Sequence, residues 1–574
     1  MEKIAKIFAQ LISILCIGAV GYLFLQGVFT VCTIQRVTER TFYVDNNLLY
    51  AVGGIGITAA LLWLVWRYGA AFCEKYEGLL VWSGVVISAV FLIWWMGQTQ
   101  FWYWGDEEKI FQYAQMFLVG DYSGWKPGGY PYMWPHQNGM ILFVAALLRF
   151  FELSQVYVIF RGLNILFYEV TLIFLWQTLR KLFPDARIAV VQMAMLFLFF
   201  PYGFYCVMFY GNVIGLGFGV VAIRCAVAYL EYDKVRYLVG CAIAMICSII
   251  FKQNDVIIFV GILLMLLLQP LRKGSAERQM DAEEKLAAPW ARQRLIKRFC
   301  RVGALIVVVC LGIQLPNWIV EVRSGIDLSG TGNSKYAHIA MGLQDSEDAP
   351  GWYNTYNERL FAECGYDKES AGDAAKANLA QTLEYYAENP MEGWSFFHRK
   401  MASQWNNPTF EGFHMQNARS TSEELSSVVK SVINDGGKAN ILLTLFLDIY
   451  ESVVLFGVLL YLVTRKDGVK ELLFAMLFIG AFVFFAVWEA KGRYVAPFYL
   501  MLIPYAAVGY YKLYEGGRRF NAAWKTVLAV AVMVLVVALC DVPVLNNSIR
   551  LGSQSEEYYQ YIHEFNNNFE GLRF

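Results

Sequence analysis

The chain has 574 residues, of which 57% are hydrophobic and 16% aromatic, while only 16% are charged. Soluble domains carry about 25% charged residues, so this composition excludes an ordinary soluble protein and predicts a polytopic membrane protein. Lys plus Arg and Asp plus Glu balance at 47 each. This balance leaves no basic field for a nucleic-acid partner.

Cysteine and histidine usage says little in favour of a metal centre. The 11 cysteines are scattered without a Cys-x-x-Cys motif, and the chain has only 5 histidines. We therefore interpret the cysteines as small buried side chains rather than as a disulfide frame or a zinc site. The sequence predicts no bound metal, and it leaves open whether a divalent cation assists as a cofactor.

Long apolar runs predict membrane-spanning helices, because backbone groups inside a bilayer must hydrogen-bond within their own segment. The runs lie at 8–31, 47–66, 79–98, 138–151, 157–178, 187–204, 208–230, 236–251, 255–269, 302–321, 440–463, 471–488, 495–513 and 525–542. As a helix, the run 138–151 rises only about 21 Å, against a hydrocarbon core of about 30 Å. We expect a short or re-entrant helix there, and therefore about 13 transmembrane helices in all.

Basic residues orient these helices, because Lys and Arg are enriched in cytoplasmic loops. Lys3 and Lys6 place the N-terminus in the cytoplasm, and the many Lys and Arg residues of 270–301 mark a cytoplasmic loop. Counting spans from these markers predicts that the loop 99–137 and the segment 322–439 are external.

The predicted organisation follows from this count. Two N-terminal transmembrane helices (1–78) precede a transmembrane core (79–321), which contains the external loop 99–137. An external, mostly helical domain (322–439) follows, and then further transmembrane helices (440–542) and an external tail (543–574). The predicted fold class is all-α and polytopic.

The acidic pair Asp106-Glu107 is the most informative motif, because it closely follows an apolar run. Ile110, Phe111 and Ala114 recur at helical spacing after it, which predicts an amphipathic helix along the membrane surface. A carboxylate at the start of that helix can take a proton from an attacking hydroxyl or amine as a general base. The competing interpretation is a helix N-cap, since acidic residues favour the first turn.

The segment 130–139 joins this loop to the next helix and contains Tyr132, His136 and Gln137. Aromatic faces stack on sugar rings and amides bond to hydroxyls, so these three are candidate substrate-binding residues. An aromatic belt at the membrane interface would give a similar composition.

Polar residues at the ends of other spans fall on the same predicted side as Asp106. The candidates are Asn212, Lys252, Arg493 and Tyr494. Cations pair with phosphate oxygens, so Lys252 and Arg493 would suit a lipid phosphate. Snorkelling toward the interface, or a Lys–Asp pair, is the alternative.

Two further charges, Arg161 and Glu169, lie inside the run 157–178. Charges within a span usually face the protein interior and pair with one another. We expect these two residues to form a structural ion pair.

The loop around Asp106-Glu107 resembles the first external loop of GT-C-fold glycosyltransferases. The shared pattern is the acidic pair, a helix with Tyr113-Ala114, then Gly120-Asp121-Tyr122 and a Tyr-x-x-x-Pro approach to the next helix. The nearest branch contains protein O-mannosyltransferases and lipid A aminoarabinose transferases, the bacterial dolichyl-phosphate-mannose-protein mannosyltransferase-like family.

A late element also matches, and two positions depart from the family pattern. Lys491-Gly-Arg493-Tyr494 followed by Pro497 resembles the family's Arg-Tyr-x-x-Pro, and Arg161 resembles the Arg of an Arg-Leu-Pro stretch. Trp134-Pro135-His136 replaces a Pro-Pro element, and Asn212 stands where relatives often have Asp. The resemblance covers 79–270 and 471–513 in outline.

The resemblance implies a GT-C-like fold and an inverting transfer at the outer face of the cell membrane. The donor would be a polyprenyl-phosphate-linked sugar among the membrane lipids, and the acceptor a glycan, a lipid or a protein. Asp106 would be the base with Glu107 assisting it. Lys252 and Arg493 would contact the lipid phosphate.

Two other functions are compatible with a polytopic membrane protein. A polysaccharide or lipid transporter, or flippase, calls for charges in the middle of spans and often for internal repeats. A membrane scaffold presenting 322–439 would have no need of Asp106. The clustering of charged residues on one predicted face favours the enzyme.

Overall fold

The computed structural model describes residues 2–35, 39–98, 103, 105–269, 289–419, 425–465, 468–517 and 552–569. The predicted span 525–542 lies outside the described residues. So do most of the loop 270–301, residues 99–102 and 104 of the external loop, and residues 543–551 and 570–574 of the tail.

Within these ranges the chain is helical apart from one two-stranded hairpin, and eight helices are long and apolar enough to cross a membrane. These are α1 (Glu2–Phe29), α2 (Leu48–Tyr68), α3 (Ala70–Gln98), α7 (Leu153–Leu182), α10 (Asn212–Tyr232), α22 (Lys438–Thr464), α23 (Leu473–Val487) with the turn before it, and the stretch Leu295–Ser324 formed by α14 (Pro289–Gly312) and α15 (Leu315–Ser324). A ninth span results if α8 (Ala186–Leu198) and α9 (Pro201–Phe204), which are bent by 49°, cross together. The protein is thus an all-α polytopic membrane protein.

Several predicted spans form shorter helices. They are α6 (Asn138–Leu148), α11 (Val235–Phe251), α12 (Val256–Leu268), α24 (Gly492–Leu502) and α25 (Pro504–Gly517). The 11 residues of α6 rise about 17 Å, well short of a core of about 30 Å. This agrees with the expected short helix, while the total of about 13 spans stays a prediction.

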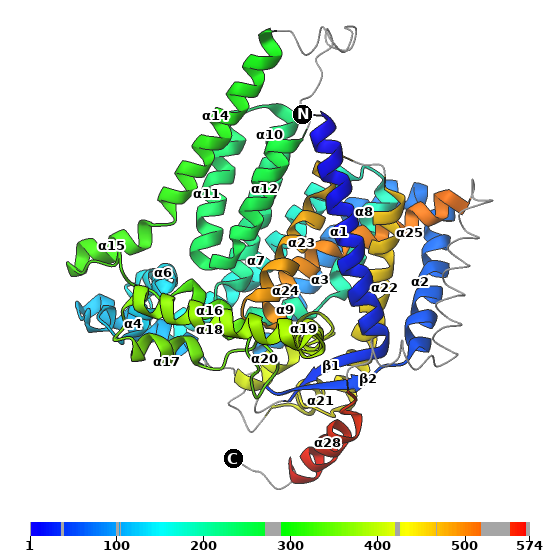
Figure 1. Cartoon of the computed structure of the whole chain (residues 1–574). Coiled ribbons are helices and arrows are strands. Elements are labelled where there is room, and N and C mark those ends of the chain that lie inside the picture. The colour runs from blue at the N-terminus through cyan, green and yellow to red at the C-terminus, as the bar shows by residue number, and fades with distance from the viewer. Residues whose placement is uncertain are drawn as a thin grey trace.

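The two ends of the helix bundle carry different segments (Figure 1). The N-terminus and the beginning of α14 lie at one end. The opposite end carries α4 (Asp106–Val119), α16 (Lys335–Gly342), α17 (Tyr356–Glu363), α18 (Lys368–Glu388), α19 (Pro390–Trp405), α20 (Gly412–Arg419), α21 (Ser427–Ile433) and α28 (Ser555–Phe569). Lys3 and Lys6, near the start of α1, and the start of α4 therefore lie at opposite ends of the bundle, while the side of the membrane that each end faces stays a prediction.

The helix after Asp106-Glu107 forms as predicted. Ile110, Phe111 and Ala114 are all buried on one face of α4, which packs against α6. The ring of Phe111 lies 4.1 Å, centroid to centroid, from that of Phe209. This apolar face fixes the start of α4 against the segment that precedes α10.

A β-hairpin between α1 and α2 was not predicted. Strands β1 (Thr30–Ile34) and β2 (Thr41–Asp45) pair antiparallel, with Cys32 opposite Tyr43. Their β-branched and aromatic residues favour extended structure. The backbone N–H of Cys32 donates to the Asn406 carbonyl at 2.8 Å, and α28 packs on β2. The hairpin is thus held between the end of α19 and the C-terminal helix.

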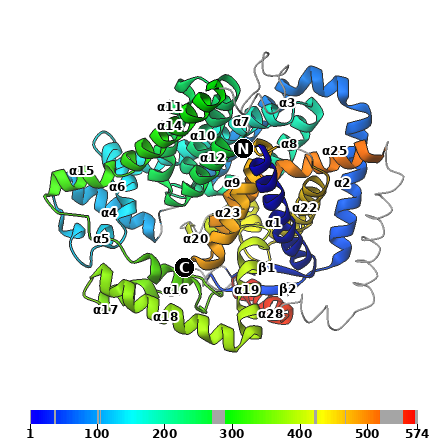
Figure 2. The ribbon, with the colours of Figure 1, turned by 45° about the horizontal axis from the view of Figure 1, so that its top comes forward.

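The helix α2 stands at the edge of the bundle in both views, beside α22 and α25 (Figures 1 and 2). Few of its residues are buried: Ala51 in its first turn and Trp66 in its last turn. The hydrophobic surface of this helix would therefore be covered by lipid in a membrane.

The expected ion pair between Arg161 and Glu169 does not form. The guanidinium of Arg161 donates to the backbone carbonyl of Met96 at 3.1 Å and lies 5.4 Å from the ring centre of Tyr157. Eight residues separate the two charges along α7, a helical rise of about 12 Å. The prediction was wrong because both side chains are on one helix but too far apart along it.

Candidate functional site

Asp106 is the first residue of α4, and it does not cap the helix. Gly105 occupies the N-cap position at φ +61°, where glycine is favoured, and no side chain makes a capping hydrogen bond there. The Asp106 carboxylate instead lies near the Tyr130 hydroxyl, which acts to lower the pKa of Asp106. The N-cap interpretation of Asp106 is therefore wrong, although its charge still lies favourably at the positive end of the helix dipole.

Glu107 occupies a different environment from its neighbour. Its side chain is buried, and its carboxylate accepts a hydrogen bond from the backbone N–H of Phe209 at 3.1 Å. The Phe209 ring also packs against Phe160, at a centroid distance of 4.0 Å. Glu107 therefore fixes the segment before α10, and the assisting role expected for it in catalysis stays a prediction.

Lys252 lies between α11 and the short helix η4 (Gln253–Asp255). Its ammonium nitrogen lies over two aromatic rings, 4.7 Å from the centroid of Tyr210 and 4.9 Å from that of Tyr494. The side-chain amide of Gln137 donates to the Tyr210 hydroxyl. Attraction between the cation and the two ring faces holds the ammonium in place.

Arg493 lies at the start of α24, where two carboxylates face its guanidinium. One nitrogen is 3.5 Å from Glu411 and 3.9 Å from Glu39. Glu411 also accepts a hydrogen bond from the Arg493 backbone N–H at 3.2 Å, and Glu39 forms an ion pair with Lys491. Glu39 comes from the turn of the hairpin, so the N-terminal segment contributes to the surroundings of Arg493.

The backbone at both carboxylates is left-handed, with φ +59° at Glu39 and φ +64° at Glu411. Such conformations are uncommon for residues other than glycine and cost of the order of 1–3 kcal/mol. Strain of this kind concentrates at functional sites, where the surrounding structure stabilises it. Here the strained backbone holds the carboxylates of Glu39 and Glu411 beside the guanidinium of Arg493.

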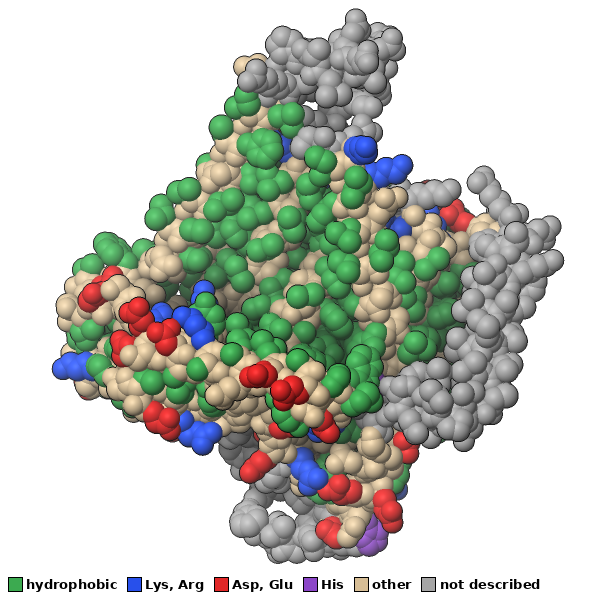
Figure 3. Space-filling model, viewed as in Figure 1, with side chains coloured by type: hydrophobic (Ala, Val, Ile, Leu, Met, Phe, Trp, Pro, Cys, Tyr) green, Lys and Arg blue, Asp and Glu red, His purple; other side chains and the backbone are tan. Residues whose placement is uncertain are grey.

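These side chains converge on one accessible region, which we call the recess. It comprises Asp106, Tyr130, His136, Tyr210, Lys252, Arg493 and Tyr494. Asp106 and His136 are exposed and the other five are partly exposed, yet surrounding protein is dense enough to shift pKa values throughout. Figure 3 shows the surface hollowed beside α15, above the layer of α16 and α18, with basic side chains at the edge of the hollow.

The charges of the recess influence one another. Burial raises the pKa of Asp106, although Arg493, the Tyr130 hydroxyl and Lys252 all act against that rise. Burial lowers the pKa of Lys252 to about 8, and Arg493 adds to that effect. Burial would also lower the pKa of Arg493, but Glu411 and other nearby carboxylates hold it well above its usual value. The site thus combines a strengthened base, an ammonium that titrates near neutrality and a permanent cation.

One wall of the recess is aromatic and holds two imidazoles. His338 of α16 stacks on Trp488 at 4.9 Å and lies 5.4 Å from Trp134, which also contacts His136. Burial lowers the pKa of His136 to about 3 and that of His338 to about 4. Both rings are therefore neutral at pH 7, and they offer aromatic faces and hydrogen-bonding nitrogens rather than charge.

Comparisons with protein-family models, with curated proteins and with solved structures found no match to this chain. A function must therefore be argued from the recess itself and from the motifs of the sequence.

Most of the predicted binding residues meet in or beside the recess, but two lie elsewhere. The Tyr132 hydroxyl donates to the Tyr366 carbonyl at 3.3 Å, and its ring stacks on Phe361. This residue joins the loop to α17. Asn212 is buried at the start of α10, and its side-chain oxygen finds no hydrogen-bond partner among the described residues. The contacts of Tyr132 and Asn212 therefore give no support to their predicted role in substrate binding.

Four residues around the recess were missed. Tyr130 lies in the predicted binding segment, so the tyrosines there were the signal for a partner of Asp106. Glu39, Glu411 and His338 are remote in sequence from the residues they contact, and no motif surrounds them. Within the described ranges, no group of three or more His, Cys, Asp or Glu side chains is arranged to hold a metal ion.

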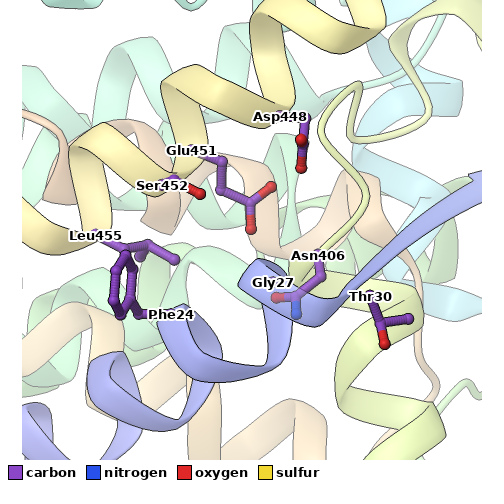
Figure 4. A pocket seen from close by; sticks show the side chains of 8 residues that line it. All are labelled: Phe24, Gly27, Thr30, Asn406, Asp448, Glu451, Ser452 and Leu455. Atoms are coloured by element: carbon purple, nitrogen blue, oxygen red, sulfur yellow. The ribbon is translucent and has the colours of Figure 1, made fainter. Parts of the chain in front are cut away.

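A second acidic group lies in the middle of α22, where Asp448 and Glu451 are one turn apart (Figure 4). We call their surroundings the α1–α22 pocket, which is lined by Phe24, Gly27, Thr30, Asn406, Asp448, Glu451, Ser452 and Leu455. Asn46 donates to Asp448 at 2.8 Å. One oxygen of Glu451 and the side-chain oxygen of Asn406 have no hydrogen-bond partner in the described part of the chain.

The α1–α22 pocket is closed and lacks cations. It has no space for a water molecule. Among the ion pairs of the described residues, none joins Asp448 or Glu451 to a Lys, Arg or His. A bound anion such as a phosphate would meet only repulsion there.

Proposed function

We propose that this protein is an inverting, membrane-embedded glycosyltransferase. It transfers a sugar from a polyprenyl-phosphate-linked donor to a glycan, lipid or protein acceptor at the outer face of the cell membrane. The observation that carries the proposal is the recess, which combines the base Asp106 with the cations Lys252 and Arg493 in one accessible place at the end of an apolar bundle.

The base acts on the acceptor. A hydroxyl or amine of the acceptor attacks the anomeric carbon of the donor sugar and gives its proton to the Asp106 carboxylate. The raised pKa of Asp106 makes it a stronger base than a free aspartate, and positioned bases of this kind contribute roughly 10²–10⁴-fold to rate. The Tyr130 hydroxyl lies near the carboxylate and helps to stabilise its ionised form.

The cations act on the leaving group. As the new bond forms, the bond between the anomeric carbon and the phosphate oxygen breaks, and its electron pair stays on the polyprenyl phosphate. Lys252 and Arg493 stabilise the charge that develops on that oxygen. Attack from the face opposite the phosphate inverts the configuration at the anomeric carbon.

The motif resemblance supports the same function. The acidic pair and the Arg493-Tyr494 element, which resemble GT-C glycosyltransferases in sequence, lie at one end of the bundle and interact through their charges. A GT-C-like fold, about 13 spans and an extracytoplasmic recess are parts of this proposal. Membrane lipids would surround the apolar helices and supply the donor.

One observation favours the alternative, a polysaccharide or lipid transporter or flippase. Asp448 and Glu451 lie at mid-span without a cationic partner in the described residues, and carboxylates at that depth are typical of ion and substrate pathways. A fluorescent polyprenyl-phosphate analogue, reconstituted with the protein in liposomes, separates the two functions. Movement of the lipid between leaflets without sugar transfer would support the transporter.

The transferase is tested by following a radiolabelled sugar from polyprenyl-phosphate-linked donors into membrane acceptors. Membranes that contain the wild-type protein should incorporate label, and membranes with Asp106→Asn should not. Glu451→Gln is the matched control, because it removes a buried carboxylate outside the recess and should leave transfer unchanged. Transfer by Asp106→Asn at the wild-type rate would reject Asp106 as the base.

A further inference from the structure

A cleft of about 390 Å³ lies between the C-terminal end of α16, α18 and α19. The three helices lie side by side in both views (Figures 1 and 2). Its volume falls in the range of small-molecule sites, roughly 300–1,000 Å³. No residue of the recess lines it.

One face of α18 supplies most of the polar lining. Asn378, Gln381, Thr382 and Tyr385 are spaced i, i+3, i+4 and i+7, so their side chains share one side of the helix. On an ordinary packed helix such a stripe would be apolar. Here it carries two amides, a hydroxyl and a tyrosine that is 51% exposed.

The charged residues of the lining are Asp345, Glu392 and Arg399, so the cleft carries little net charge to attract an ion. Arg399 forms an ion pair with Asp345 at 3.7 Å, both within the cleft. Tyr386 packs against Phe396, at a centroid distance of 5.4 Å, and gives the cleft an aromatic floor. Amides and hydroxyls over aromatic rings suit a neutral ligand rich in hydroxyl groups.

A chain of amide contacts leads from the cleft toward the recess. Gln344 donates to Asn378 at 2.9 Å, and Asn354 donates to Gln344 at 3.1 Å. The neighbouring Tyr353 donates to Glu358 at 2.7 Å, and the charge of Asp106 influences the Tyr353 hydroxyl. Asn354 thus reaches the cleft through Gln344, and the hydroxyl of the neighbouring Tyr353 lies within the electrostatic influence of Asp106.

We propose that this cleft binds an oligosaccharide, which serves as the acceptor of transfer. Its role as acceptor site rests on the proposed transferase function, whereas carbohydrate binding in the cleft does not. Its chemistry selects a glycan over a peptide: the lining lacks the long apolar groove into which an amphipathic helix docks and the sheet edge to which an extended peptide adds.

The experiment measures binding by the full-length protein in lipid nanodiscs to a printed array of oligosaccharides and to a peptide array. We expect selected oligosaccharides to bind. The double variant Gln381→Ala and Tyr385→Ala should weaken that binding at least tenfold, because it removes an amide and an aromatic face from the cleft. Leu383→Ala is the matched control, since Leu383 is exposed on the other side of α18.

A second variant distinguishes a loss of binding from a loss of folding, in case the double variant does not fold. Gln381→Glu keeps the size of the side chain and introduces a charge, and it should weaken oligosaccharide binding severalfold with an unchanged unfolding temperature. Asp106→Asn should bind oligosaccharides as the wild type does. If the wild-type protein binds oligosaccharides but transfers no sugar, the transferase is rejected and the cleft assignment is kept.

Three results would overturn the cleft assignment. These are the absence of oligosaccharide binding at millimolar concentration, binding that survives both cleft variants, and preferential binding to the peptide array. None of these results would affect the role of Asp106 in transfer, so the two proposals fail independently.

Discussion

The recess and the α1–α22 pocket both place carboxylates in a largely apolar protein, but they are built differently. In the recess, Asp106 is accessible and interacts with two cations and a tyrosine hydroxyl. In the pocket, Asp448 and Glu451 are buried without a cation among the described ion pairs, and no water fits beside them. The presence of an acidic pair is common to both and does not by itself indicate a catalytic site.

The recess differs from the α1–α22 pocket because it combines a carboxylate with two cations in a region that is accessible from outside the protein. A base alone cannot stabilise a leaving phosphate, and cations alone cannot take a proton from an acceptor. The charged side chains that line the closed pocket are both carboxylates, so the pocket fits a structural or ion-linked role better than group transfer. Variants that remove matched groups from the two regions can separate these roles.

The largest expected effect is on transfer by Asp106→Asn. The amide keeps the shape of the side chain but cannot accept the proton, so we expect a loss of about 10²–10⁴-fold in the rate of sugar transfer. Asp448→Asn should transfer sugar at nearly the wild-type rate. Radiolabel incorporation by the purified proteins measures both, and equal losses in the two variants would remove the distinction between the regions.

The second effect is on stability and contrasts a carboxylate that pairs with buried Lys491 with one that has no ion-pair partner among the described residues. Glu39→Gln leaves Lys491 with its charge unpaired, and breaking such a pair should cost about 3–5 kcal/mol in the free energy of unfolding. Glu451→Gln should cost less than about 1 kcal/mol, because the carboxylate has no ion-pair partner to lose. Thermal unfolding in detergent compares them. A larger loss for Glu451→Gln would indicate a cation bound in the α1–α22 pocket.

The third effect is on donor affinity. Arg493→Ala removes a charged contact to the lipid phosphate, and hydrogen bonds to charged groups are worth about 1.5–3 kcal/mol, so affinity for polyprenyl phosphate should fall roughly 10- to 150-fold. Arg465→Ala serves as the control, because Arg465 follows α22 and donates to the Ala9 carbonyl of α1, toward the end of the bundle opposite α4. Titration with polyprenyl phosphate in nanodiscs measures both variants, and equal affinities would reject the phosphate site.

The smallest effect is a pH dependence. The pKa of Lys252 is lowered to about 8, so its ammonium binds phosphate below that pH and loses its charge as the pH rises through it. Donor affinity should fall severalfold between pH 7 and pH 9. Lys252→Arg should flatten this fall, since arginine stays charged. A fall of unchanged size in that variant would assign the titration to another group.

The same pH series tests the base. Burial raises the pKa of Asp106, and only the ionised carboxylate accepts a proton, so transfer should be lost as the pH falls through that raised pKa. The acid limb should therefore lie above the usual aspartate value of about 3.9. An acid limb below that value would contradict a base whose pKa is raised by the surrounding protein.

Local sequence patterns predicted the membrane class, the helix α4 and the short helix α6, because hydrophobic periodicity and run length act over a few turns. The same patterns placed Asp106, Lys252 and Arg493 on one side. They missed the hairpin between α1 and α2, whose short strands lie between two apolar runs. They also missed Glu39, since its contact with Arg493 joins residues 454 positions apart in the chain.

Two predicted details failed for a related reason. Arg161 was assigned to Glu169 from their presence in one span, but their spacing along α7 keeps them apart. The sequence allows Asp106 to be the N-cap of α4, whereas Gly105 occupies that position in the structure. Side-chain partners depend on tertiary packing, which a single span does not encode.

The most direct test is a structure of the protein in nanodiscs loaded with polyprenyl phosphate. We predict density for the phosphate within hydrogen-bond reach of Lys252 and Arg493, with the Asp106 carboxylate facing the position of the sugar. Phosphate density away from these two cations, or an empty recess at saturating lipid, would contradict the proposed site.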